Sequence, residues 1–187
     1  MPARDVLDEK PERLLALFKE IQHATDRVAA ISAAAFLDDS LGAALSARFV
    51  RLGKEWEDRV FSRQGAPLGT LSAKITMGFA LGLYGPQTRA DLNTIRSVRN
   101  DFAHTADPIS FADEGIAAKC KKLTSPERLD KDPIYRGFGI PFDLSNPRER
   151  FIYAARSLAT EVVLRGRERR PSYRSAPSRP VPPDSLP

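Results

Sequence analysis

The chain has 187 residues, enough for one domain with a hydrophobic core and an appended tail. Its 29 Lys and Arg residues against 24 Asp and Glu residues give a formal charge of +5. This balance permits contact with nucleic acid or with an acidic protein but requires neither. With a single cysteine, Cys120, the chain cannot form an intrachain disulfide. One cysteine and two histidines in the whole sequence also make a structural zinc site unfavourable. We therefore expect no metal and no cofactor.

Residues 1–10 are polar and charged, which predicts a flexible N-terminus without a secretory signal. We find no apolar run of the roughly 18–20 residues that a membrane helix needs. The sequence therefore predicts a cytoplasmic protein.

Helical periodicity dominates the first third of the chain. Pro11 suits the first position of a helix, and apolar residues recur at helical spacing through Ile31. The run Asp38-Asp39-Ser40 predicts a break followed by an N-cap. A second helix is then expected from about Leu41 to Phe61, with Trp56 in the core.

Three more helices are expected between residues 70 and 123. Glycines and a proline at 64–69 predict a loop before them, and the Gly85-Pro86 pair separates the first two. The expected starts are a cap at Thr70 or Ser72, a start near Gln87 or Thr88, and a cap at Ser110 for the shorter last one.

The last third of the chain changes in composition. Residues 124–145 are irregular by their prolines and glycines, and Asn146-Pro147 opens a last helix. From Pro171 onward, proline, serine and arginine predict disorder. The sequence therefore predicts an all-α protein, with a single compact bundle of about six helices at 11–170 and a disordered tail at 171–187.

The helix expected up to residue 104 has an apolar side and a polar side. At 100° per residue, the side that we expect to face the core carries Leu92, Ile95, Val98 and Phe102. The opposite side carries Asn93, Arg96, Ser97, Asn100 and His104. Arg99 lies on the flank. A two-fold dimer would bring this polar side of two copies together.

Two interpretations of this helix end stay open. In a metal-independent ribonuclease, His104 would move a proton at a ribose 2′-hydroxyl or a leaving oxygen, Arg99 would stabilise the phosphorane, and Asn100 would orient either group. Arg99 and His104 are five apart, roughly 140° around an ideal helix, so aiming both at one point needs a distorted helix end or a second protomer. Alternatively, His104 complements the helix dipole or belongs to an interface.

Three blocks follow one another in the middle of the chain. They are PLGTLSAKI at 67–75, GFALGL at 78–83 and DLNTIRSVRNDFAH at 91–104, with Ile109-Ser110-Phe111 after them. Their order and spacing resemble the MltR family, the mannitol operon repressor-like proteins, over roughly 12–123. This resemblance implies a compact all-helical protein that regulates transcription negatively through a protein partner, without a helix-turn-helix.

Arg99, Asn100 and His104 also resemble the arginine-to-histidine motif of the HEPN superfamily. Those proteins are helical dimers that include many metal-independent ribonucleases, but some members with that fold are inactive binding modules. We therefore favour a regulator that binds a protein partner and forms a homodimer over an enzyme, and keep the endoribonuclease as the alternative.

Other polar residues have a functional and a plain interpretation. Lys74 is either an anion contact near a helix start or an ordinary surface lysine. We group it with Asn93, Arg96 and Asp101 as candidate binding residues. The basic end of the last helix is either a weak RNA or DNA contact or a solubilising tail, and it carries Arg165, Arg167, Arg169 and Arg170. His23 is expected at the solvated surface, and Cys120 is expected to pack as an apolar residue.

Overall fold

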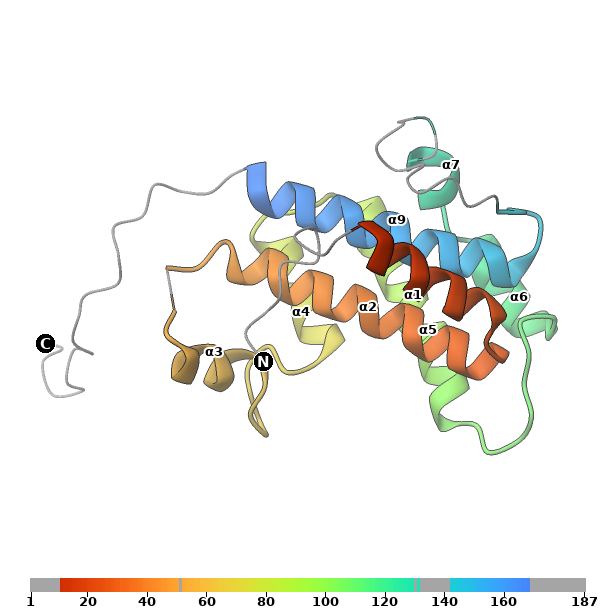
Figure 1. Ribbon diagram of the computed structural model, residues 1–187, viewed down its shortest axis with the longest axis horizontal. Helices are drawn as coiled ribbons and strands as arrows, with labels where there is room; N and C mark the ends of the chain where they lie inside the picture. The colour runs from red at the N-terminus through yellow and green to blue at the C-terminus, as the bar shows by residue number, and fades with distance from the viewer. Residues whose placement is uncertain (1–10, 51, 130, 132–141, 169–187) are drawn as a thin grey trace, which may run out of the picture.

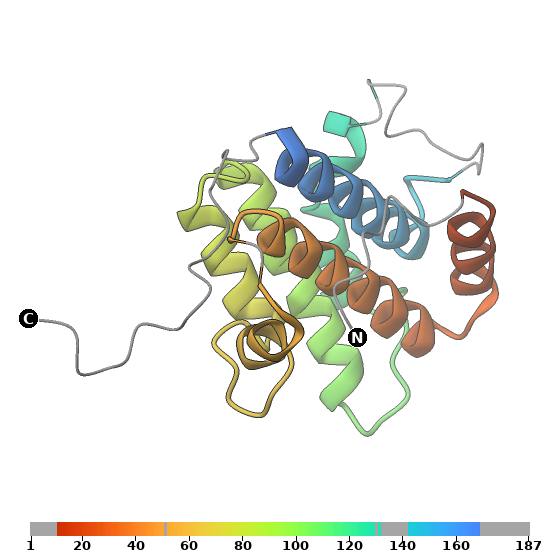
Figure 2. The same cartoon turned by 60° about the vertical axis from the view of Figure 1, so that its left-hand side comes forward.

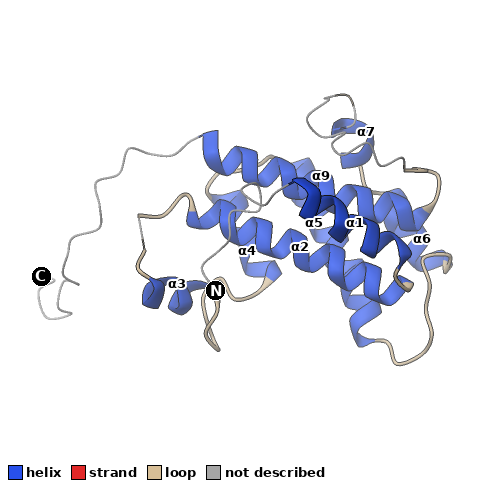
Figure 3. Cartoon of the chain, in the orientation of Figure 1, coloured by secondary structure: helices blue, strands red, loops and turns tan. Residues whose placement is uncertain are grey.

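The computed structural model describes residues 11–50, 52–129, 131 and 142–168 of the chain. In these ranges every regular element is a helix, which confirms the all-α prediction (Figure 1 and Figure 3). In chain order the helices are α1 (Pro11–His23), α2 (Asp26–Ser46), α3 (Lys54–Phe61), α4 (Leu71–Ala80), α5 (Pro86–His104), α6 (Glu114–Lys121), α7 (Ser125–Leu129) and α9 (Pro147–Glu168). The expectations for 1–10 and for the tail at 171–187 fall outside the described residues.

Helix α2 is the centre of the bundle. It packs against α1, α4, α5 and α9, and it runs beside α9 in both views (Figure 1 and Figure 2). By length and composition α2 is apolar enough to cross a membrane. The prediction from the sequence that no apolar segment has this length was therefore wrong. Ten of its residues are buried against the other helices. This packing is that of the core helix of a folded bundle.

The first helix breaks at a different place from the one predicted. The chain leaves α1 after His23 and starts α2 at Asp26, whereas the sequence predicted the break at 38–40. Arg148 of α9 stabilises this break, because its guanidinium donates to the carbonyl of Gln22 at 2.7 Å and its Nε lies 2.9 Å from Asp26 Oδ1. By donating to the last carbonyls of α1, Arg148 satisfies that helix end, and its ion pair with Asp26 ties the start of α2 to the same side chain.

The polar run at 38–40 lies inside α2 because its side chains have partners there. Ser40 Oγ donates to the carbonyl of Phe36 at 2.8 Å, and Asp38 Oδ1 lies 2.9 Å from Lys74 Nζ of α4. Satisfied in this way, these residues do not compete with the backbone of the helix. The prediction of a cap at 38–40 was therefore wrong.

The predicted helix at 41–61 is in fact two pieces. Helix α2 ends at Ser46, and the short α3 starts after Gly53. Among its described residues α3 buries none fully, and Trp56 is 49 % exposed with the guanidinium of Arg59 over its ring at 5.1 Å. The expectation that Trp56 belongs to the core was wrong, because α3 lies at the edge of the bundle and leaves Trp56 half exposed.

The later helices follow the sequence more closely. Thr70 caps α4 by accepting from the amide of Ala73 at 3.2 Å, and Asn146 caps α9 by accepting from the amide of Arg148 at 2.9 Å. The cap of α6 is displaced, because Asp113 and not Ser110 is its N-cap. Ser110 Oγ donates to the Asp113 carboxylate instead. The short α7 also lies within the segment expected to be irregular.

Aromatic rings join the helices in the core. The ring of Phe111 lies 4.8 Å from that of Phe102 and 5.3 Å from that of Phe151. Cys120 is fully buried in the same core, as expected, and burial raises the pKa of its thiol to about 12. A thiol with this pKa is a packing group at neutral pH and not a nucleophile.

Candidate interaction face on α5

The apolar side of α5 faces inward, as its periodicity predicts. The side chains of Leu92, Ile95, Val98 and Phe102 are fully buried. On the other side Asn93, Arg96, Ser97 and Asn100 are half-buried and His104 is exposed. We call these five residues the α5 strip. The strip is accessible from outside the bundle, so a partner can reach it.

The polar contacts of the α5 strip stay within its own helix. Asn93 Nδ2 donates to the carbonyl of Arg89 at 3.0 Å, and Asn100 Oδ1 accepts from Arg99 at 3.1 Å. Arg96 Nε is shielded from solvent, and no acceptor for it lies within the described ranges. A shielded donor without an acceptor costs free energy.

The structure does not bring Arg99 and His104 together. The hydrogen bond of Arg99 goes to its neighbour Asn100, and in the described part of the chain no hydrogen bond or ion pair joins Arg99 to His104. Helix α5 continues regularly to His104, so its end is not distorted toward a joint site. One copy of the chain therefore leaves the proposed catalytic pair apart.

The C-terminus of α5 is held by an arginine that sequence reasoning missed. Arg27 of α2 donates to the carbonyls of Phe102 at 2.7 Å and Thr105 at 2.9 Å. These carbonyls are the acceptors that a helix end leaves open. Because Arg27 lies 75 residues before Phe102, local sequence carries no signal for this contact.

Asp101 and Lys74 both form ion pairs with neighbouring helices. Asp101 Oδ2 lies 2.6 Å from Lys119 Nζ, which ties α5 to α6. Lys74 is buried, and its ammonium faces Asp38, so the surface-lysine interpretation was wrong. The binding roles of both residues stay predictions.

A buried polar network lies behind α5 and was not foreseen. Asp91 accepts from the amides of Thr124 at 3.1 Å and Ser125 at 2.6 Å, which fixes the start of α7. Thr88 Oγ1 donates to the Glu161 carboxylate of α9 at 3.3 Å. The available signal was that Thr88 and Asp91 lie on the apolar side of α5, seven and four residues before Ile95, where polar residues need partners.

Comparison with known proteins gives one informative result. No family model matches the chain, and no curated protein matches it. A chain in the X-ray structure of the MtlR–HPr complex from Escherichia coli is similar in structure, with a TM-score of 0.61. The match covers 80 % of this chain and 97 % of that chain at 18 % sequence identity. The chain has an MtlR-like fold.

The MtlR-like fold agrees with the fold that the resemblance to mannitol operon repressor-like proteins implied. None of these comparisons supports a relationship to the HEPN superfamily. At 18 % identity the likeness establishes the arrangement of the helices and not the function of individual residues.

Proposed function

We propose that this chain is a regulatory protein that acts by binding a protein partner. The observation that carries the proposal is the structural likeness to a chain of the MtlR–HPr complex, which extends over 97 % of that chain. The solved complex contains MtlR and HPr. The corresponding partner for this chain is an HPr protein from the organism in which this chain occurs. Negative regulation of transcription, which the sequence resemblance implies, would then be exerted through the partner.

The α5 strip is our candidate for the surface that the partner contacts. It combines an exposed imidazole, two half-buried amides and the half-buried guanidinium of Arg96 on one helix face. These groups can bind acceptors on a polar or acidic partner surface, and the half-buried guanidinium of Arg96 is the cation among them.

Titration calorimetry with purified HPr from the same organism tests this proposal. Wild-type protein is expected to bind, and Arg96→Gln is expected to weaken binding about tenfold through loss of one charged hydrogen bond. Arg63→Gln removes the same charge from an exposed position outside α5 and is expected to bind like wild type. Equal affinities of the two variants would show that the α5 strip is not the binding surface. If wild-type protein does not bind HPr, HPr is not the partner.

A homodimer through the same strip is a second proposed use of this surface. Asn100→Arg places a charge at the centre of the strip, so two copies would repel each other there. Sedimentation of the variant against wild type distinguishes the cases, because an unchanged dimer would show that the copies meet elsewhere.

Nucleic-acid contact through the basic end of α9 stays a proposal as well. Arg165 and Arg167 lie in the last turn of α9, whereas Arg169 and Arg170 fall outside the described residues. Binding by such a stretch is electrostatic, so a gel-shift affinity that falls steeply with salt would support it.

A further inference from the structure

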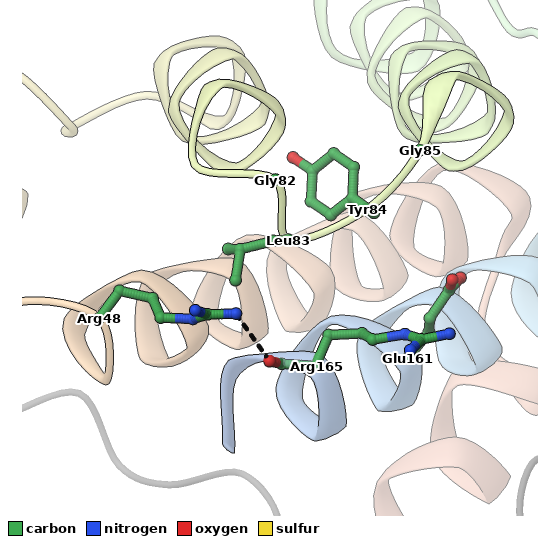
Figure 4. A pocket seen from close by; sticks show the side chains of 7 residues that line it. All are labelled: Arg48, Gly82, Leu83, Tyr84, Gly85, Glu161 and Arg165. Atoms are coloured by element: carbon green, nitrogen blue, oxygen red, sulfur yellow. Dashed lines mark hydrogen bonds between the residues drawn. The ribbon is translucent and has the colours of Figure 1, made fainter. Parts of the chain in front are cut away.

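An open cavity of about 360 Å³ lies between residues 82–85, Arg48 and the end of α9 (Figure 4). The two arginines on its wall interact with other parts of the chain. Arg48 donates to the main-chain carbonyl of Arg165 at 3.0 Å, the bond that Figure 4 marks, and Arg165 also has contacts of its own. Their charges are therefore used within the fold. The arginines of α5, which begins beside this cavity, are placed differently.

One face of α5 carries a row of side chains that donate hydrogen bonds. They follow one another at intervals of three or four residues, which places them within about 80° of each other on an ideal helix. We call these residues the donor row: Arg89, Asn93, Arg96, Asn100 and His104. The first and the last are exposed, and the three between them are half-buried. The row is about 22 Å long at the rise of an α-helix.

The arginines of the donor row have no carboxylate beside them. Arg89 stacks on the ring of Phe79 at 4.6 Å, which positions its guanidinium but leaves its charge in place. Among the described residues, neither Arg89 nor Arg96 forms an ion pair. Helix α4 beside them carries no acidic residue. In α5 itself, Asp91 is buried and Asp101 pairs with a lysine of α6. The face is therefore positively charged.

The amides of the donor row lie between these charges. Asn93 Nδ2 donates to the carbonyl of Arg89 at 3.0 Å, so its Oδ1 is left as an acceptor within the described ranges. Asn100 Oδ1 accepts from Arg99 at 3.1 Å, which leaves its Nδ2 as a donor toward a ligand. Cations and neutral amides thus alternate along the helix, as charged phosphates and neutral sugars alternate along a nucleic-acid strand.

We propose that the donor row binds the sugar–phosphate backbone of single-stranded RNA. Guanidinium groups match phosphate oxygens, and amides match the ribose 2′-hydroxyl, which both donates and accepts. The middle of the row is half-buried between neighbouring helices, so α5 does not stand out far enough to enter a major groove as a recognition helix does. The length of the row corresponds to roughly six stacked nucleotides, within the site sizes of single-strand-binding folds.

This assignment concerns binding without cleavage, and it does not rest on the proposed function. All residues of the donor row except Arg89 also belong to the α5 strip, so RNA and a protein partner would compete for this face. The test below contains no HPr, and its first variant lies outside the α5 strip. Its failure would therefore leave the proposed function untouched.

Fluorescence anisotropy of the full chain with a labelled uridine RNA of about 15 nucleotides, in EDTA, tests the assignment. Wild-type protein is expected to bind at low salt. Each phosphate contact to a single strand contributes about 0.7 to the slope of log affinity against log salt, so Arg89→Gln is expected to lower that slope by about 0.7 and to weaken binding several-fold. Arg96→Gln is expected to do the same. The control Arg63→Gln removes the same charge from an exposed position outside α4 and α5, and it is expected to leave both quantities unchanged.

Two competitors identify the ligand. Thymidine DNA of the same length lacks the 2′-hydroxyl and is expected to displace the labelled RNA about threefold to tenfold less well than unlabelled RNA does. Polyglutamate of equal charge is expected to displace it poorly. The proposal is overturned if wild-type protein binds no RNA, if both arginine variants bind like Arg63→Gln, or if either competitor is as effective as unlabelled RNA. Arg89 is exposed, so Arg89→Gln is expected to keep the Tm of the wild type.

Discussion

Gly166 lies where α9 crosses α2, and its lack of a side chain lets the two helices touch. A Cβ at this position would lie 3.0 Å from Ala44 Cα and 3.2 Å from Ala44 O, both backbone atoms that cannot move without shifting α2. Gly78 is a second such position, since a Cβ there would overlap the ring of Tyr84. Single residues therefore set the distances between the central helices.

Gly166→Ala is expected to lower the free energy of unfolding by about 1–3 kcal/mol, because α9 must move away from α2. Urea denaturation measures the change. Gly115→Ala is the matched control, since a Cβ there meets nothing within 4 Å and alanine favours the helix, and it is expected to raise stability by about 0.5–1 kcal/mol. A loss of stability in the control equal to that in Gly166→Ala would contradict this account.

The buried ion pair of Lys74 with Asp38 makes a second prediction at this scale. Lys74→Met is expected to destabilise the protein by about 1–3 kcal/mol, because the Asp38 carboxylate loses its partner in a mostly buried place. Adding Asp38→Asn is expected to recover part of the loss, and a double-mutant cycle measures the coupling. Additive effects of the two substitutions would show that the pair contributes nothing.

At the scale of helices, arginines from other elements bind the carbonyls at helix C-termini. Arg148 binds the end of α1, Arg27 binds the end of α5, and Arg150 donates to the carbonyl of Cys120 near the end of α6. These contacts complement the negative end of each helix dipole. Some of the arginines that make the chain basic therefore stabilise the fold itself. These arginines need neither a nucleic-acid partner nor a role in solubility to explain them.

Arg27→Met is expected to lower the free energy of unfolding by about 1.5–3 kcal/mol, the contribution of charged hydrogen bonds to otherwise open carbonyls. Hydrogen exchange is expected to accelerate at the C-terminal end of α5 more than elsewhere. Arg63→Met, at an exposed position, is the control and is expected to change neither quantity. Acceleration spread evenly over the protein would mean that Arg27 supports the whole fold and not this helix end.

The sequence predicts well those helices whose ends depend on local residues. Thr70 and Asn146 cap their own helices, and the inward side of α5 follows from its apolar spacing. By contrast, Arg148, more than 100 residues away, holds the break between α1 and α2, and Lys74 of α4 pairs with Asp38 inside α2. No local pattern contains these contacts, and the cavity beside Arg48 requires three distant segments to be placed first.

At the scale of the whole molecule, the bundle separates the core of α5 from an accessible polar strip. Arg99 and His104 share no hydrogen bond in one copy, so a ribonuclease site would need a second protomer, and we expect a protein that acts as a regulator to leave RNA intact. Incubation of purified protein with mixed RNA in EDTA tests this, beside the variant His104→Ala. Cleavage by wild-type protein that disappears in the variant would overturn the prediction and favour the ribonuclease alternative.

The most direct test of the central claim is hydrogen–deuterium exchange of this chain with and without saturating HPr from the same organism. If α5 contacts the partner, amide exchange slows at 93–104 while the exposed helix α3 is unaffected. Unchanged exchange along the whole of α5 in a complex shown to form would contradict the claim that this helix is the regulatory surface.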